Sequence, residues 1–180
     1  MIRTVALTLA LSFAVAASTP AAPGRPRVPL PEVTQLYAGD AAVARLTAVA
    51  IAAEQVAFEV RRYGVSEDWL ERRVRARLGP ASVRQIGRPE ALAADSAGLL
   101  VVRLQSTRIP GRETFAWHLS LGLHQRLHAV GQDAPVLLAR TWEATASLGV
   151  TSGRALEASV GETLDQQVAE FLAARRGGGR

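Results

Sequence analysis

The three histidines of the chain, His118, His124 and His128, lie close together in sequence, and such a cluster first suggests a metal site or a proton-transfer site. In the surrounding segment, FAWHLSLGLHQRLHAV (115–130), apolar residues occupy nearly all odd-numbered positions and polar or small residues the even-numbered ones. This is the period of a β-strand with one buried face. Consecutive histidines on such a strand are roughly 20 Å and 13 Å apart. Metal–nitrogen bonds of about 2 Å cannot bridge those gaps, so we expect no shared metal site here.

The polar face of this strand is nevertheless a candidate site for a small ligand or a hydrolytic reaction. It presents His118, His124 and Arg126, and Glu143 on the following strand could join them. The sequence contains no G-x-S-x-G elbow and no H-E-x-x-H motif, so no nucleophile or metal-bound water is indicated. A histidine within about 3.2 Å of a carboxylate or serine in a concave pocket would favour an enzyme. A flat, solvated face would favour a binding protein.

The composition excludes several classes of chemistry. The chain has no cysteine, which excludes disulfides, thiolate zinc sites and a cysteine nucleophile. It has no lysine either, which excludes Schiff-base chemistry and a P-loop lysine. The net charge of +5 comes from scattered arginines without an aromatic stacking platform, so we expect no nucleic-acid partner. No dinucleotide or other cofactor motif occurs, and we expect no cofactor.

A second candidate surface is the basic face of the clearest helix in the sequence, VSEDWLERRVRARLGP (65–80). Ser66 is a natural N-cap, and the Gly-Pro pair at the end stops the helix. Leucine and valine recur every four residues on one face. The basic residues of the other faces are Arg72, Arg73, Arg75 and Arg77. They form either a solvated surface or a contact for an anionic partner.

The remaining patterns predict the elements that position these residues. Period-two alternation predicts strands over 55–61, 82–87 and 98–109, with the alanine-rich stretch before the first of these open to a helix. A turn at 131–135 joins the histidine strand to a strand over 136–150, as a hairpin. On that last strand one face is expected to hold the apolar residues Leu138, Trp142, Ala144, Ala146 and Leu148.

A long amphipathic helix closes the chain and completes the expected fold. Its apolar stripe consists of Leu156, Val160, Leu164, Val168, Phe171 and Leu172. We therefore expect an α+β fold, a two-layer sandwich in which a mostly antiparallel sheet of about four to five strands carries two amphipathic helices on one face.

The chain is expected to divide into a leader, a tether and one domain. Residues 1–17 have a positive start, a short apolar stretch and small residues for cleavage near Ala16 or Ala17, which is typical of a Sec-type signal peptide. The proline-rich segment that follows predicts an extended tether over 18–45. The single α+β domain is expected over 46–175, with a disordered tail at 176–180. No later apolar run is long enough to span a bilayer, so we expect no transmembrane span in the mature chain.

From Gly64 onward the chain resembles a group of small uncharacterised secreted bacterial proteins. The segments that carry the resemblance are GVSEDWLERRVRARLG, GLLVVRLQSTRIPGRETFAWHLSLGLHQRLHAV, ARTWEATASLGV and VGETLDQQVAEFLAARR. No catalytic residues are known for this group, so the resemblance implies none here. The expected architecture is also similar to that of periplasmic accessory proteins of envelope assembly and transport, although those are often lipoproteins and this chain has no cysteine to anchor a lipid.

These features favour an exported, non-enzymatic binding or accessory domain of the bacterial envelope, in the periplasm or secreted. Its partner would be an envelope protein or another envelope component, bound through exposed strand edges or the basic helix. The alternative is a small periplasmic hydrolase or small-ligand binder that uses the polar sheet face.

Overall fold

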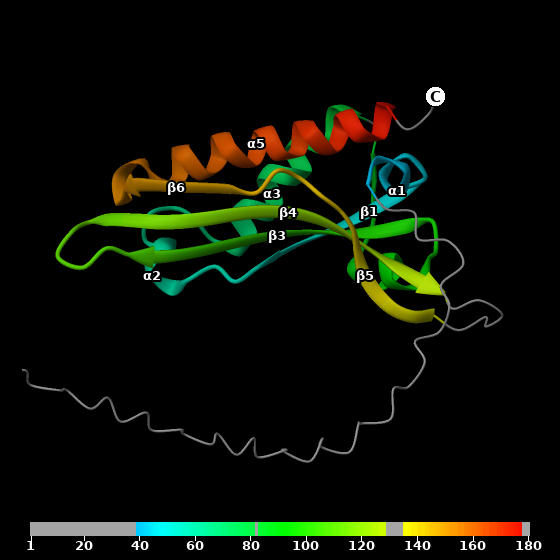
Figure 1. Cartoon of the computed structure of the whole chain (residues 1–180), viewed down its shortest axis with the longest axis horizontal. Helices are drawn as coiled ribbons and strands as arrows, with labels where there is room; N and C mark the ends of the chain where they lie inside the picture. The colour runs from blue at the N-terminus through cyan, green and yellow to red at the C-terminus, as the bar shows by residue number, and fades with distance from the viewer. Residues whose placement is uncertain (1–38, 82, 129–134, 178–180) are drawn as a thin grey trace, which may run out of the picture. The chain divides into compact units, whose positions relative to one another are not determined.

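The computed structural model describes residues 39–81, 83–128 and 135–177, which form one mixed sheet with helices on both faces (Figure 1). The strands are β1 (Ala48–Glu54), β2 (Arg84–Gln85), β3 (Ala97–Arg108), β4 (Thr114–His128), β5 (Pro135–Glu143) and β6 (Ser147–Ser152). Their order is β2-β1-β3-β4-β5, and β6 also pairs with β4. β1 runs parallel to β2 and β3, whereas β4 is antiparallel to β3, β5 and β6.

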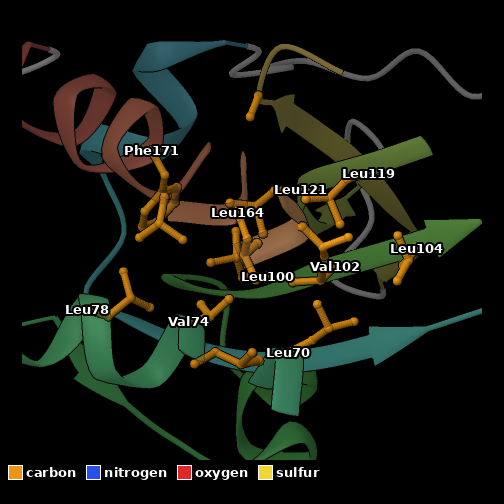
Figure 2. Packing of buried hydrophobic residues seen from close by; sticks show 14 of the residues in the cluster. Leu70, Val74, Leu78, Leu100, Val102, Leu104, Leu119, Leu121, Leu164 and Phe171 are labelled. Carbon is orange, nitrogen blue, oxygen red and sulfur yellow. The ribbon is translucent and has the colours of Figure 1, made fainter. Parts of the chain in front are cut away.

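Two amphipathic helices, α3 (Glu67–Leu78) and α5 (Gly153–Gly177), cover one face of this sheet and enclose the main core. Figure 2 shows Leu70 and Val74 of α3 and Phe171 of α5 packed toward the strands β3 and β4. Shorter helices complete the described fold: α1 (Asp40–Ala44), α2 (Phe58–Arg61), α4 (Arg88–Ala93) and the 3₁₀ turn η1 (Gly79–Ala81).

The expected α+β class with a mostly antiparallel sheet is confirmed, but the details differ. The sheet has six strands within the described residues, and the β1 side of it is parallel. The second face is partly covered as well. There α4 packs through Ala91 on a small cluster that includes Ala50 and Val101. The parallel connection from β1 to β3 is long enough to carry three helices and β2.

The predicted helix at 66–78 is confirmed, with the local interactions that its sequence indicates. The Ser66 hydroxyl oxygen accepts a hydrogen bond from the backbone N–H of Trp69 at 3.2 Å. This N-cap satisfies one of the backbone donors that a helix start leaves unpaired. Leu70, Val74 and Leu78 are fully buried, so the four-residue apolar repeat is the core-facing stripe of α3.

The prediction of a strand over 55–61 is wrong, because β1 occupies the alanine-rich stretch just before it. Gln55 ends the strand with a φ of 64°, in the left-handed region, and α2 follows. Val56 and Val60 are buried, but Phe58 between them is 82% exposed. The two valines are four residues apart and so lie on the same side of a helical turn. The alternation of Val56, Phe58 and Val60 therefore does not correspond to the buried face of a strand.

The expected hairpin partner of β4 is two strands, β5 and β6, which pair with successive parts of β4. The register of β4 against β5 shifts between Leu123 and His124, and the residues between β5 and β6 lie outside both strands. Each irregularity reverses which residues face the core, since a one-residue shift moves every side chain to the other face. Leu138 and Leu148 are thus 42% and 83% exposed, and their expected core position is wrong.

The first and last described helices extend beyond the bounds expected for the domain. Residues Asp40–Ala44 form α1, in which Ala42 and Val43 are buried, so part of the segment expected to be a tether is folded. At the other end α5 continues to Gly177. Four of the expected segments lie wholly or partly outside the described residues. They are the signal peptide, the tether up to residue 38, the turn up to residue 134 and the tail from residue 178. No helix in the described ranges is long and apolar enough to cross a membrane.

Candidate binding surface on the open sheet face

The face of the sheet opposite α3 and α5, here called the open face, carries all four residues of the expected polar site. His118, His124 and Arg126 alternate along β4 with the core-facing leucines. Glu143 on β5 lies opposite Gly122, directly beside this row. The placement of the four residues on one face therefore agrees with the alternation of the sequence.

His124 lies between two ion pairs in the middle of the open face. On one side the Arg103 Nε atom is 3.2 Å from the Glu54 carboxylate, and on the other the Arg140 guanidinium is 2.7 Å from the Glu143 carboxylate. Burial, followed by the positive charges of Arg103 and Arg140, lowers the pKa of His124 below its ordinary value. The Nε2 atom of His124 is buried and has no hydrogen-bond partner among the described residues. The lowered pKa favours the neutral form of this imidazole in the folded protein.

The histidines of the open face have no hydrogen-bond or ion-pair contact with a carboxylate or a serine in the part of the chain that the structure describes. The same ranges contain no group of three or more histidine or carboxylate side chains placed to hold a metal ion. The geometry that would favour a hydrolase is therefore not found there, and the alternation places His118 and His124 on the same face without a shared centre.

Arg126 takes part in holding α4 on the sheet. Its guanidinium donates a hydrogen bond to the Ala93 carbonyl at the end of α4 and lies 3.6 Å from the Asp95 carboxylate. Only 20% of the Arg126 side chain is exposed. This residue of the expected site is used to anchor the helix.

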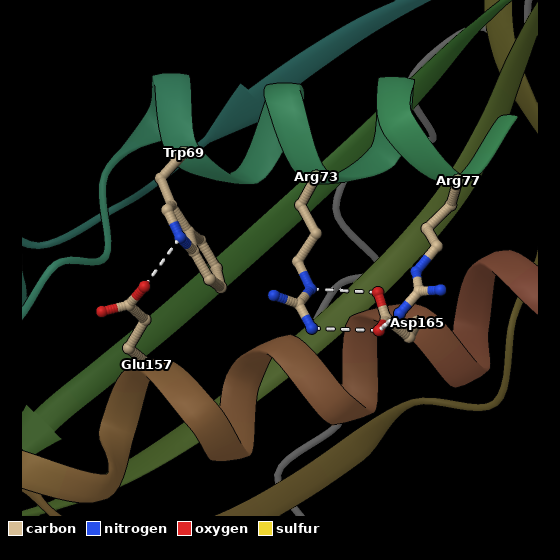
Figure 3. Close-up of polar contacts among 5 residues, drawn as sticks. All are labelled: Trp69, Arg73, Arg77, Glu157 and Asp165. Atoms are coloured by element: carbon tan, nitrogen blue, oxygen red, sulfur yellow. Dashed lines mark hydrogen bonds and ion pairs between the residues drawn. The ribbon is translucent and has the colours of Figure 1, made fainter. Parts of the chain in front are cut away.

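Two of the four basic residues of α3 are used in the contact between α3 and α5. Figure 3 shows the Arg73 guanidinium facing Asp165 of α5, with two parallel hydrogen bonds of 3.0 Å. The Arg77 guanidinium binds the same carboxylate. Desolvation of Asp165 opposes ionisation, but the hydrogen bonds from Arg77 and Arg73 outweigh it and lower the pKa of Asp165.

The rest of this basic face is only partly available to a partner. Arg75 pairs along the helix with Glu71 at 3.1 Å, an i,i+4 pair that is worth a few tenths of a kcal/mol, about 0.3–0.5. Arg72 is exposed. Beside them, the Trp69 indole N–H donates to Glu157 of α5 at 3.0 Å (Figure 3). Three of the four arginines of this basic face are thus paired with acidic residues of α3 or α5.

A shallow apolar groove lies on the open face, and we call it the β6 groove. It has a volume of about 750 Å³ and lies where β3, β4 and β6 run side by side. Its open-face side chains are Gln105, Thr107, Ala116, His118, Leu148 and Val150. Leu148 and Val150 are 83% and 67% exposed, which is unusual for two neighbouring aliphatic side chains on one strand face.

The exposure of Leu148 and Val150 is fixed by the packing on the opposite side of β6. Gly149 lies against the Trp117 ring so closely that a Cβ there would be 2.2 Å from a ring carbon. Trp117 and Gly149 are direct cross-strand partners with their contact on the core side. Any other register of β6 would place a side chain in the tryptophan ring, so Leu148 and Val150 are held on the open face.

Sequence reasoning identified the face but not these two residues, because it expected Leu148 in the core. The comparisons with known proteins add no relative: no family model matches the chain, and no curated protein matches it significantly. The candidate surface is therefore argued from the exposure, charge and register of its own residues.

Proposed function

We propose that this protein is an exported, non-enzymatic binding domain of the bacterial envelope, which contacts an envelope protein or another envelope component through the β6 groove. The observation that carries this proposal is the exposure of Leu148 and Val150, 83% and 67%, beside a groove of about 750 Å³. Aliphatic side chains held in water by the register of a strand are stabilised when a partner covers them.

The bacterial envelope is proposed from the start of the sequence. Residues 1–17 have the charge, apolar stretch and small residues of a signal peptide, and a proline-rich tether is expected after them. Export would place the domain in the periplasm or outside the cell. The resemblance to small secreted bacterial proteins and to accessory proteins of envelope assembly and transport supports the same location.

The experiment is recovery of the partner from the native envelope after gentle crosslinking. The test variant is Leu148→Lys with Val150→Lys, and the control is Leu92→Lys, at an exposed leucine of α4. The side chains of Leu148, Val150 and Leu92 are all exposed, so these substitutions leave the core intact. We expect the wild type and the control to retain the partner and the double variant to lose it. Recovery of no partner, or equal recovery with the double variant, contradicts the proposal.

A small-ligand binder is the second candidate, and the size of the β6 groove favours it. Ligand pockets usually have volumes of about 300–1,000 Å³ and a few polar groups among apolar ones. His118, Gln105 and Thr107 would be those polar groups. A ligand of this site would raise the melting temperature of the purified wild type, and would raise it less in a His118→Ala variant.

A further inference from the structure

β6 is an edge strand that lacks the features by which proteins protect sheet edges. Within the described residues β2, β5 and β6 each pair on one side only. An unpaired edge offers a row of backbone N–H and C=O groups to another strand. Edges are usually protected by charged side chains, by short length or by a covering element.

The other two edges have such protection. β2 has only two residues, and its Arg84 is exposed and pairs with Glu90 at 2.7 Å. β5 has the exposed ion pair of Arg140 and Glu143. In contrast, β6 has six residues, Ser-Leu-Gly-Val-Thr-Ser, with no charge and no proline. β6 is therefore the edge that is suited to accept a further strand.

From these edges we infer that β6 pairs, antiparallel, with β6 of a second copy of this chain, so that two sheets join into one. An antiparallel pair centred on Gly149 is self-complementary, as a twofold interface requires. It places Leu148 opposite Val150 of the other copy, and Val150 opposite its Leu148. All four aliphatic side chains then lie together on the open face, where cross-strand aliphatic pairs stabilise a sheet.

The choice of a second copy over an unrelated strand follows from charge and from the neighbouring helix. In a self-pair centred on Gly149, residues near the centre lie diagonally close to their own copies, so a charge there would be repelled by the same sign, and β6 has none. On α5, small uncharged residues recur every four positions at Ala155, Ser159 and Thr163, on the flank away from Asp165. Glu170, on the same flank, accepts a hydrogen bond from the Thr145 N–H just before β6, so this flank follows the strand edge. The uncharged positions Ala155, Ser159 and Thr163 of two such flanks can approach each other without charge repulsion.

The inference goes beyond the proposed function, because the edge of β6 would hold the second copy while its open face would hold the partner. In the dimer the two β6 grooves would lie side by side. Each copy would add its Leu148 and Val150 to one continuous apolar strip.

The test is the mass of the purified full chain in solution, measured by light scattering and sedimentation, for the wild type and two charged variants. The wild type should have the mass of two chains. Leu148→Lys with Val150→Lys, and separately Leu148→Glu with Val150→Glu, should each weaken the dimer at least about tenfold, since like charges would then meet across the interface. Leu92→Lys is the matched control and should leave the dimer unchanged.

Mixing the two charged variants provides the most specific readout. Lysines of one copy would then lie opposite glutamates of the other, so the mixture should regain the two-chain species that each variant alone has lost. A monomeric wild type overturns the inference, as does a dimer that survives in either charged variant or a mixture that stays monomeric. A monomeric wild type that still recovers an envelope partner leaves the proposed function standing. A dimer that recovers no partner refutes that function alone.

Discussion

At the scale of single residues, one buried amide joins α5 to the irregular end of the sheet. Gln167 is 1% exposed, and its side-chain amide donates to the Leu119 carbonyl at 3.1 Å and to the Thr145 carbonyl at 3.0 Å. These bonds hold the segment between β5 and β6, whose offset exposes Leu148. Gln167→Leu keeps the side-chain volume but removes the hydrogen-bond donor of the Leu119 and Thr145 carbonyls. We therefore expect the free energy of unfolding to fall by about 1–3 kcal/mol. Urea denaturation measures this free energy. Gln166→Leu, at the exposed neighbouring position, is the control and should change it little.

The lowered pKa of His124 predicts how stability depends on pH. Burial and the charges of Arg103 and Arg140 hold this imidazole neutral in the folded protein, whereas the unfolded chain takes up a proton near the ordinary value of 6.5. The unfolded state then binds more protons, so this residue makes the fold less stable as the pH falls below about 6.5. His124→Gln should show a shallower loss of stability between about pH 7.5 and pH 5. Identical slopes for the variant and the wild type would contradict this account of His124.

At the scale of elements, Asp165 of α5 joins the two helices of the main layer by binding two arginines of α3. Asp165→Asn removes the charge that Arg73 and Arg77 share, and we expect the free energy of unfolding to fall by about 1–2 kcal/mol through the loss of the Arg73 pairing. Because the pKa of Asp165 is lowered by folding, its contribution is present above an unfolded value of about 3.9 and is lost as the pH falls through the folded value.

The difference between the Asp165→Asn variant and the wild type should therefore shrink in acid. Urea denaturation at neutral pH and near pH 3.5, about where the unfolded carboxyl titrates, tests this. Glu162→Gln, on an exposed position of the same helix, is the control. An effect that is the same at both pH values would show that Asp165 acts through packing alone.

Long elements with a single period could be predicted from the sequence, and interrupted ones could not. α3, β4 and α5 follow one period over many residues, and their buried faces are the expected ones. The face of β4 that carries His118 and His124 was therefore predictable. The shift between β5 and β6 was not, because nothing in the local sequence shows that Gln167 and Glu170 of α5 hold Thr145 out of the strands. The exposure of Leu148 depends on that shift.

The groups that the arginines contact could not be predicted from the sequence either. The sequence pattern of a basic helix face is the same whether its arginines contact solvent, a partner or an acidic residue far along the chain. Arg73 and Asp165 are 92 positions apart, and their pairing depends on how α3 and α5 pack. Likewise the contact of Arg126 with α4 depends on the parallel connection that places this helix on the open face.

At the scale of the whole molecule, export is the prediction that concerns the start of the chain. The small residues that end the apolar stretch predict cleavage near Ala16 or Ala17. N-terminal sequencing of the protein recovered from the envelope fraction should therefore begin shortly after these residues. A recovered protein that begins at Met1 would contradict the export that the proposed function requires.

The β6 end of the open face is the surface that we propose contacts an envelope component. Site-specific photocrosslinking in intact cells tests it most directly, with the photoreactive residue placed at position 148 or, as the control, at position 92. The proposed function predicts an adduct with an envelope component from position 148, where the native leucine is 83% exposed, and none from position 92 on α4. The absence of such an adduct from position 148, or the same adduct from both positions, would contradict the claim.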